Sequence, residues 1–444
     1  MKKWSVGYEV VKQLVRLAFW LSHKKITVIG KNQIPDDRPV IFAPNHQNGL
    51  MDPLAVICTS STQPVWLARA DLFKLKSVRP ILHFFKILPI YRIRDGKSKL
   101  AENETIFNKA IEILEHKKQL ALFPEATHSG KRQMLPHRKA IPRIAFLAEE
   151  KNNFKLNLQI IPVGIYYSHY WKFNREVLVN YGKPFTIDHY QEQYLQNPNQ
   201  SLLDLKDEIE QKVEELTINV RSKKYYENYE LILKLLEPSF IWNQQRDSLK
   251  EYFFKRREYL LRIEKHERTN PGAFKVFHEQ LDQIREVIEK QEINIEAIDR
   301  RQLKPEVLFI KTLLALVLSP LVALGFILHG LPFLLPRYFI QRKVKDPTFY
   351  STFQFVSGLV IYTSLAIVIG ALLFILTGQW FWPFVFLPAF LFTGKLSFMA
   401  FQYWVKHWQQ LTFYQFSKKH PKTAEILIVE IEFIKSELDR IIHA

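Results

Sequence analysis

A histidine and an aspartate stand close together early in the chain, in the stretch FAPNHQNGLMDP at residues 42–53. A neutral imidazole, with an ordinary pKa of about 6.5, suits removal of a proton from an alcohol near neutral pH. Asp52 can accept a hydrogen bond from one ring nitrogen of His46, which fixes the tautomer and leaves the other nitrogen as a base. The ordinary alternative is a polar turn, because Asn, Gly, Asp and Pro are all turn formers.

The spacing of His46 and Asp52 restricts how they can meet. Six residues advance a regular helix by about 600°, so the two side chains would lie on different faces of a continuous helix. They can approach each other only if the segment between them turns, and Gly49 makes a turn sterically easy. We therefore expect the region of Asn48 and Gly49 to bend the chain and return Asp52 to His46.

A second polar group stands in the same relation to a short apolar run. Glu125 lies in LALFPEATHSG and follows the run Leu120–Phe123, as His46 follows Val40–Ala43. In an open α/β sheet, ligands bind outside the carboxyl ends of the strands. Both groups therefore lie where a site is expected.

The pattern around these groups predicts an α/β domain with a mostly buried sheet. Helix-like stretches such as Glu104–Glu115 and Ile141–Glu149 alternate with short apolar runs. The runs are Ile26–Ile29, Val40–Ala43, Val65–Leu67, Gln119–Phe123, Leu158–Ile165 and Val177–Val179. We place this domain at residues 26–195 and a helical region at 196–304, for which a helical cap, a membrane-surface platform and a simple spacer all stay open.

The last third of the chain is depleted of charge. Charged residues make up 24% of the 444 residues, yet none occurs from Thr312 to Pro336 or from Pro347 to Gly394. Each window exceeds the ~20 apolar residues that cross ~30 Å of hydrocarbon. We therefore predict a membrane region at 305–405, followed by a C-terminal helix within 406–444.

Basic residues suggest how the membrane region is oriented. We predict spans at 353–376 and 381–401, joined by a turn without basic residues, so that both ends of the pair are cytoplasmic. The stretch 308–335 has basic residues on both sides, and Pro320 and Pro332 offer breaks, which favours a re-entrant segment over one tilted helix. The catalytic domain is then expected on the cytoplasmic face.

The N-terminal residues 1–25 read as an amphipathic helix. Lys12 and Arg16 interrupt what would be the apolar core of a signal peptide, so we expect an uncleaved helix that lies in the membrane interface. Packing on a soluble core is an equally good explanation of the pattern. The single cysteine, Cys58, excludes intrachain disulfides and fits a cytosolic catalytic part.

The formal net charge of +18 fits nucleic acid, anionic lipid or an acidic substrate. Beside membrane segments, lipid headgroups and phosphorylated substrates are the better partners. No nucleic-acid-binding module is recognisable, so we expect none bound.

Four short motifs together resemble those of the lysophosphatidic-acid and glycerol-3-phosphate acyltransferase superfamily. NHQNGLMD resembles the first motif, LPIYRIRDG at 88–96 the second, FPEATHS the third and IIPVGI at 160–165 the fourth. Any one of them is weak alone, but their order across residues 40–165 is specific. The resemblance implies that residues 26–195 are an α/β acyltransferase domain, and it leaves residues 200–444 unexplained.

The motifs depart from the usual pattern at three places. Five residues separate His46 from Asp52 rather than four, as in a divergent glycerol-phosphate acyltransferase branch. Ala126 replaces the usual glycine and His128 the usual arginine. If His128 is neutral, other side chains that carry a positive charge must bind the anion. The candidates are Arg92, Arg94, Lys131, Arg132 and Lys139.

The family resemblance also implies a mechanism. His46 would deprotonate a hydroxyl of glycerol-3-phosphate or 1-acylglycerol-3-phosphate, and Asp52 would orient His46. The hydroxyl would then attack the thioester of an acyl donor, either acyl-CoA or acyl carrier protein. The residues predicted to bind substrate are Arg92, Glu125, Thr127, His128 and Lys139. The family needs no metal, and no cofactor is expected.

Several alternatives stay open. Arg92 can be a surface salt bridge, His128 a hydrogen-bonded structural residue and Lys139 a solvated charge. The acceptor can be a lyso-aminolipid. A metal-dependent hydrolase lacks a His-Glu-x-x-His motif, and a non-catalytic lipid-binding protein at the membrane surface would not need His46.

Overall fold

The computed structural model describes residues 5–74, 76–92, 96–236, 248–298 and 303–443. The chain divides into two compact units. The first holds residues 1–219 together with 340–356, and the second holds 220–339 and 357–444. The first unit therefore extends beyond the predicted domain end at 195, and it includes a short segment from the membrane region.

A seven-stranded sheet forms the centre of the first unit, in the order β1-β7-β6-β2-β5-β3-β4. All neighbouring strands are parallel except β6 and β7. The strands are β1 (His23–Ile29), β2 (Val40–Pro44), β3 (Val65–Arg69), β4 (Ile87–Ile90), β5 (Gln119–Ala121), β6 (Gln159–Tyr167) and β7 (Arg175–Tyr181). Every residue of β2 and β6 is buried, as both faces of a parallel sheet are when helices cover them. The predicted α/β fold with a mostly buried sheet is confirmed.

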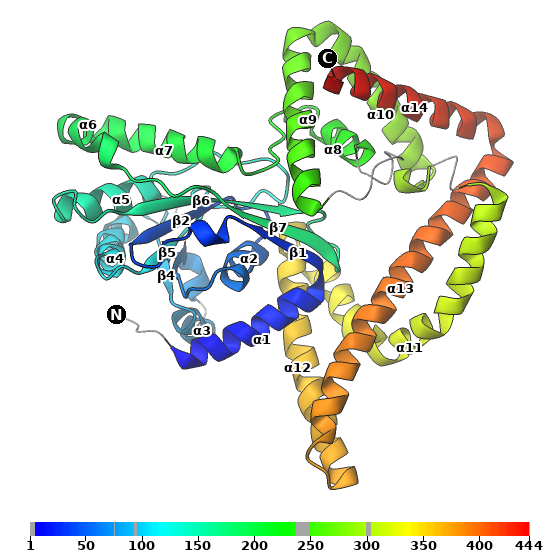
Figure 1. Ribbon diagram of the computed structural model, residues 1–444, viewed down its shortest axis with the longest axis horizontal. Helices are drawn as coiled ribbons and strands as arrows, with labels where there is room; N and C mark the ends of the chain where they lie inside the picture. Colours follow the sequence, from blue (N-terminus) through cyan, green and yellow to red (C-terminus); the bar gives the residue numbers. More distant parts are fainter. Residues whose placement is uncertain (1–4, 75, 93–95, 237–247, 299–302, 444) are drawn as a thin grey trace. The chain divides into compact units, whose positions relative to one another are not determined.

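Helices cover both faces of this sheet. Ile41 and Leu120 pack with residues of α4 (Lys97–Glu115), α5 (Ala140–Lys151) and α7 (Pro198–Glu214). Figure 1 shows α5 and α7 above the sheet, with α1 (Val6–Ser22) and α2 (Met51–Thr59) below it. The short elements are η1 (Lys31–Gln33), η2 (Ala70–Lys74), α3 (Arg79–Phe84), η4 (Asp188–Tyr190) and α6 (Gln191–Gln196).

Helix α1 has two different apolar faces. On one face Tyr8, Val15 and Phe19 are buried, and the Lys12 ammonium donates to the Ser60 and Thr62 carbonyls at 3.1 and 2.8 Å. The other face exposes Val6, Val10, Leu14, Leu17 and Trp20. The helix therefore packs on the domain and still presents an apolar stripe, so its place in the membrane interface stays a prediction.

The second unit is helical throughout the residues that the structure describes. Its elements outside the membrane region are α8 (Tyr226–Leu235), α9 (Leu249–Thr269), α10 (Pro271–Lys290), η5 (Ile295–Ala297) and α14 (Pro421–His443). Helix α14 packs on α9 and α10 and buries the apolar stripe of Leu427, Ile431, Ile434, Leu438 and Ile441. The stripe thus packs against the middle helices, as its spacing predicts.

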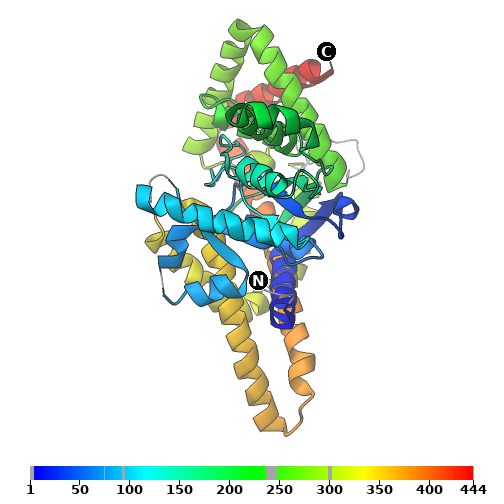
Figure 2. The ribbon, with the colours of Figure 1, turned by 90° about the vertical axis from the view of Figure 1, so that its left-hand side faces the viewer.

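Three helices of the described residues are long and apolar enough to cross a membrane. They are α11 (Pro305–Lys343), α12 (Tyr350–Thr377), which follows η6 (Pro347–Phe349), and α13 (Trp382–Lys419). Helices α12 and α13 cover the two predicted spans, and Figure 2 shows the short turn that joins them. Helix α13 continues to Lys419, so residues 406–419, which we assigned to the C-terminal segment, extend α13, and α14 begins only at Pro421.

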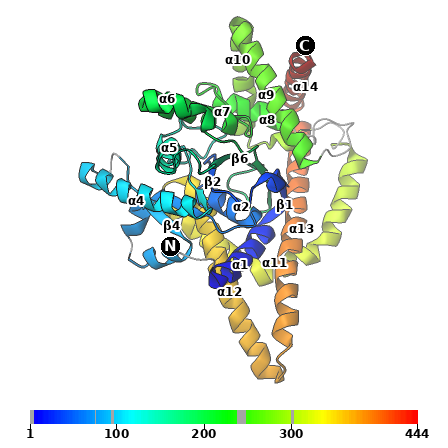
Figure 3. The ribbon, with the colours of Figure 1, turned by 60° about the vertical axis from the view of Figure 1, so that its left-hand side comes forward.

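The predicted breaks at Pro320 and Pro332 do not end α11. Both prolines, and also Pro336, lie inside one helix, which Figures 1 and 3 show as strongly bent. A proline removes one N–H donor and crowds the preceding turn, so it can bend a helix without ending it. Gly325 of α11 packs closely against Ser397 of α13. A re-entrant course of this segment stays a prediction.

Candidate active site

His46 and Asp52 meet at the carboxyl end of the central strand. His46 follows β2, and Asp52 lies in the first turn of α2. The His46 Nδ1 atom is 2.9 Å from the Asp52 Oδ2 atom. The pair has the geometry in which a buried carboxylate fixes the tautomer of an imidazole, so that Nε2 is the nitrogen left for chemistry.

The five residues between them turn as expected at Asn48 and Gly49. Gly49 adopts a left-handed conformation with φ of +44°, which glycine reaches without steric cost. The Asp52 Oδ2 atom also accepts hydrogen bonds from the backbone N–H groups of Gln47 and Asn48, both at 2.7 Å. The carboxylate therefore closes the loop and binds the imidazole with the same oxygen.

The backbone on both sides of His46 is fixed by buried groups. The Asn45 side chain exchanges two hydrogen bonds with the backbone of Ile165 on β6, at 3.2 and 2.6 Å. The His46 N–H donates to the Glu125 Oε1 atom at 2.7 Å. The imidazole stacks on the Phe123 ring, with centroids 3.9 Å apart. Among the described residues no protein group bonds Nε2, and 14% of the side chain is exposed.

Glu125 is buried and uses both carboxylate oxygens. In addition to the His46 N–H, it accepts the Leu135 N–H at 2.8 Å. Burial raises the pKa of Glu125 to about 8, and the two backbone donors oppose that rise. The contacts seen for Glu125 are thus with the chain itself. It joins the third motif to the backbone of His46, and its predicted contact with substrate stays a prediction.

His128 lies beside the dyad but supplies no fixed charge. Its ring centroid is 5.2 Å from that of His46 and 4.7 Å from that of Phe349. Burial, and secondly the neighbouring His46, lower the pKa of His128 below its ordinary value. The residue is therefore neutral at pH 7, unlike the arginine usual at this position. Thr127 next to it is exposed.

The basic side chains predicted to bind substrate, Arg92 and Lys139, are not bonded to the dyad. The Arg92 guanidinium is 3.2 Å from Asp71, which also binds Arg69. These two arginines, Arg69 first, lower the pKa of Asp71 to about 2. Lys139 is half-buried directly before α5. Neither Arg92 nor Lys139 bonds His46 or Asp52, and Arg94 lies outside the described residues.

Two buried residues behind Asp52 carry no motif and were not predicted. Burial and the negative charge of Asp52 raise the pKa of Tyr167 well above its ordinary value. The Arg175 guanidinium lies over the Tyr167 ring at 4.8 Å and bonds the Tyr170 carbonyl. Burial lowers the pKa of Arg175 to about 10, while Tyr167 and Asp52 oppose this.

A second group of unpredicted residues comes from the first turn of α12. Ser351 donates to the Asn48 side chain, and the Leu50 N–H donates to Thr352. These residues are about three hundred positions from the dyad in sequence, and no short motif marks them.

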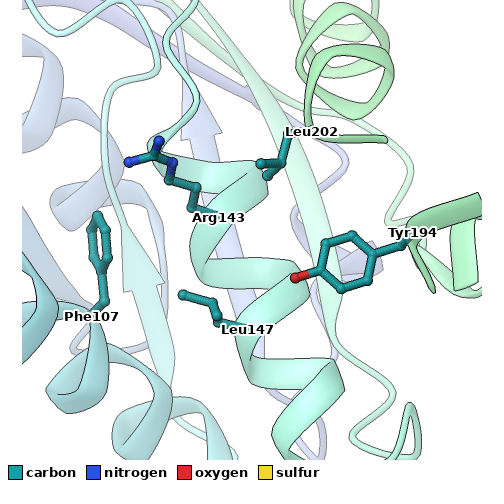
Figure 4. Close-up of a pocket in the computed structure, with 5 residues that line it drawn as sticks. All are labelled: Phe107, Arg143, Leu147, Tyr194 and Leu202. Atoms are coloured by element: carbon teal, nitrogen blue, oxygen red, sulfur yellow. The ribbon is translucent and has the colours of Figure 1, made fainter. Parts of the chain in front are cut away.

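The described residues contain no group of three His, Cys, Asp or Glu side chains that could hold a metal ion. A surface pocket of about 280 Å³ lies on the helical face of the same unit (Figure 4). It is lined by Phe107, Arg143, Leu147, Tyr194 and Leu202. None of the predicted site residues lines it, so it is separate from the dyad.

Residues 25–166 match the family described as Acyltransferase. The chain is 25% identical, over 177 residues, to the 1-acyl-sn-glycerol-3-phosphate acyltransferase of Borreliella burgdorferi; the match covers 40% of this chain and 65% of that protein. The crystal structure of the 1-acyl-sn-glycerophosphate acyltransferase PlsC from Thermotoga maritima is similar at 22% identity and a TM-score of 0.32, covering 45% of this chain and 79% of that one. The matched stretch contains all four motifs, so this part of the chain is similar to the Acyltransferase family.

Proposed function

We propose that this protein is a membrane-bound O-acyltransferase. It moves a fatty acyl group from a thioester donor, acyl-CoA or acyl carrier protein, to a hydroxyl of glycerol-3-phosphate or 1-acylglycerol-3-phosphate. The observation that carries the proposal is the His46–Asp52 pair, joined at 2.9 Å within the part of the chain that matches the acyltransferase family.

The reaction needs one base and no nucleophile on the enzyme. The Nε2 atom of His46 takes the proton of the acceptor hydroxyl while its oxygen attacks the thioester carbonyl. The tetrahedral intermediate collapses, the carbon–sulfur bond breaks, and the thiolate receives the proton from His46. Asp52 keeps the imidazole in the required tautomer and stabilises the imidazolium that forms. The chain contains no Gly-x-Ser-x-Gly elbow, the usual sign of an acyl-serine route.

Because His128 is neutral at pH 7, the phosphate of the acceptor needs a different, positively charged side chain to bind it. Arg92 and Lys139 are our candidates, although Arg92 is shared with Asp71. Thr127, which is exposed, can contact the acceptor from the third motif. The uncharged His128 also favours a second acceptor class, a lyso-aminolipid, which presents a hydroxyl without a phosphate.

The membrane helices fit an enzyme whose product stays in the bilayer. We propose that the catalytic domain lies on the cytoplasmic face, since the basic residues that flank α12 and α13 prefer that side. The exposed apolar stripe of α1 would rest in the same interface. A reporter fused after Lys345 tests the orientation, because an extracytoplasmic signal there contradicts it.

The decisive experiment uses the purified full-length protein with a labelled acyl donor. Each acceptor is offered separately: glycerol-3-phosphate, its 1-acyl derivative and a lyso-aminolipid. Transfer that is lost in His46→Ala and survives exhaustive chelation supports the proposal and excludes a metal-dependent hydrolase. Transfer to the lyso-aminolipid alone corrects the acceptor, and transfer to none of them overturns the proposal in favour of a lipid-binding protein.

A further inference from the structure

The short helix η6 and the first turn of α12 lie against the loop that holds the dyad. Residues 340–356 belong to the same compact unit as the sheet, although the helices on both sides continue into the membrane region. Within this segment, residues 346–352 make the contacts, and we name them the linker. Asp346 opens it by accepting the Thr348 N–H at 2.9 Å, which starts the single turn of η6.

The linker bonds both sides of the turn between His46 and Asp52. The Ser351 hydroxyl donates to the Asn48 side-chain oxygen at 2.5 Å, and both residues are buried. The Leu50 N–H donates to the Thr352 hydroxyl at 3.1 Å. The turn that accommodates the additional residue of the first motif is therefore held from outside by the linker.

Two glycines show how closely the linker fits. A Cβ atom on Gly130 would lie 2.4 Å from the Thr348 Cγ2 atom, and one on Gly49 would lie 2.8 Å from the Thr352 hydroxyl. Both distances are too short for a real side chain. Gly130 also donates its N–H to the Gln47 carbonyl at 3.1 Å. The first and third motifs thus leave room for the linker at the same place.

One chain of hydrogen bonds leads from the linker to the base. Asn48 accepts from Ser351 and donates its side-chain N–H to the Tyr170 carbonyl at 3.1 Å, so its side chain is held at both ends. Its backbone N–H donates to the Asp52 Oδ2 atom at 2.7 Å, the atom that bonds His46. Movement of Asn48 would therefore change the position of the Asp52 carboxylate.

We propose that the linker is part of the acyltransferase site and that Ser351 is a positioning residue for the dyad. The inference rests on the proposed function. Ser351 acts through Asn48 and Asp52, and it does not touch the reacting atoms. Phe349 of the linker packs edge-on against the His128 ring. The loop that carries the base is thereby tied to the chain segment from which a membrane helix begins.

The first test compares Ser351→Ala with Ser351→Thr in the full-length protein, with labelled acyl-CoA and 1-acylglycerol-3-phosphate in detergent micelles. A misplaced catalytic group lowers kcat more than it weakens binding, so we expect Ser351→Ala to lower kcat about tenfold with KM changed less than about twofold. Ser351→Thr keeps the hydroxyl and should recover most of kcat. Ser364→Ala, on an exposed position of the same helix α12, is the matched control and should behave like the unmodified protein.

A kcat of Ser351→Ala equal to that of the unmodified protein overturns the proposal. So does a loss that Ser351→Thr does not recover, because the hydroxyl is then not the group that matters. If the unmodified protein transfers no acyl group to any acceptor, the proposed function fails, and this test then says nothing against the linker contact itself.

The second test measures that contact without requiring activity. Gly130→Ala forces a clash with Thr348, so it should lower the midpoint of thermal unfolding, and Thr348→Ala should relieve part of that loss. Residues in contact give non-additive effects in a double-mutant cycle, whereas distant residues give additive ones. Additive shifts for Gly130→Ala and Thr348→Ala would show that the linker does not lie on this loop, and they would overturn the proposal even in an active enzyme.

Discussion

The first motif holds the residues expected for proton removal in place, whereas the third motif lacks the charged residue expected to bind a phosphate. In the first motif His46, the proposed base, is held by Asp52 and Phe123, and Asn45 next to it bonds the backbone of Ile165. In the third motif the position where the family usually has arginine holds His128, which is neutral at pH 7. The groups proposed for proton removal are therefore held in place, whereas the charge that would bind a phosphate is absent from its usual position. We therefore propose that catalysis and acceptor choice are separable in this chain.

The largest effects are expected from the dyad. His46→Ala removes the base, and general-base catalysis is worth roughly 10²–10⁴-fold in rate. Asp52→Asn should cost a similar factor, because an amide favours the wrong tautomer of the imidazole. Residues that act as a unit are not additive, so the double variant should be no slower than His46→Ala. The measurement is acyl transfer under saturating substrate.

Asp36→Asn is the matched control for the dyad, because Asp36 is exposed and lies outside the site. It should keep full activity. A double variant slowed by the product of the two single factors would mean that His46 and Asp52 act independently. The first motif would then not hold the two residues as one unit for proton removal.

Glu125 connects the two motifs and should give the next largest effect. Glu125→Ala leaves the partly buried N–H groups of His46 and Leu135 without their acceptor, at up to about 1–3 kcal/mol for each. We expect a lower midpoint of thermal unfolding and a loss of kcat of about 10- to 100-fold, since the backbone of the base is released. Glu210→Ala, which removes a single acceptor from the His137 N–H, should have a smaller effect on kcat.

Glu125 also makes stability depend on pH. Its pKa in the folded protein is about 8, above the ordinary value of 4.5, so the folded state binds the proton more tightly than the unfolded state. The free energy of unfolding that Glu125 contributes is full below pH 4.5 and is lost as pH rises toward 8. Relative to Glu125→Gln, the unmodified protein should therefore lose thermal stability across this window. A difference that stays constant with pH would contradict the raised pKa.

His128→Arg tests whether the third motif lacks the charge that would bind a phosphate, and it should change KM moderately. A fixed guanidinium should lower KM for a phosphate-bearing acceptor about 3- to 10-fold at pH 7.5, since charge-assisted hydrogen bonds are about twice as strong as neutral ones. KM for a lyso-aminolipid should not fall. Because the pKa of His128 is lowered, the unmodified protein should approach the KM of the variant only at acidic pH.

The control for this variant is His116→Arg, an exposed histidine at the end of α4. It adds the same charge to the chain away from the dyad and should leave KM unchanged. An unchanged KM in His128→Arg would mean that the phosphate does not bind next to residue 128. Arg92 or Lys139 would then be the better candidate for binding it.

The sequence was sufficient for features that depend on neighbouring residues. Apolar runs defined the sheet, charge-free windows defined α12 and α13, and a glycine within the first motif marked the turn that returns Asp52 to His46. It was not sufficient where distant segments decide. Ser351 meets Asn48 only in the folded chain. Helix α11 continues through three prolines, which the low helix propensity of proline does not predict.

The smallest expected effect concerns Ala126, where the family usually has glycine. Ala126 has a φ of +59°, in the left-handed region that costs a residue with a side chain about 1 kcal/mol. Ala126→Gly should therefore raise the free energy of unfolding by about 0.5 kcal/mol, after the added freedom of glycine in the unfolded chain is subtracted. The same exchange at Ala18, inside α1, should lower it by about 1 kcal/mol. If chemical denaturation gives changes of opposite sign in the free energy of unfolding for these two variants, the backbone conformation at each position accounts for the difference. Activity unchanged in Ala126→Gly would then show that the departure from glycine strains the third motif without altering proton removal by the first.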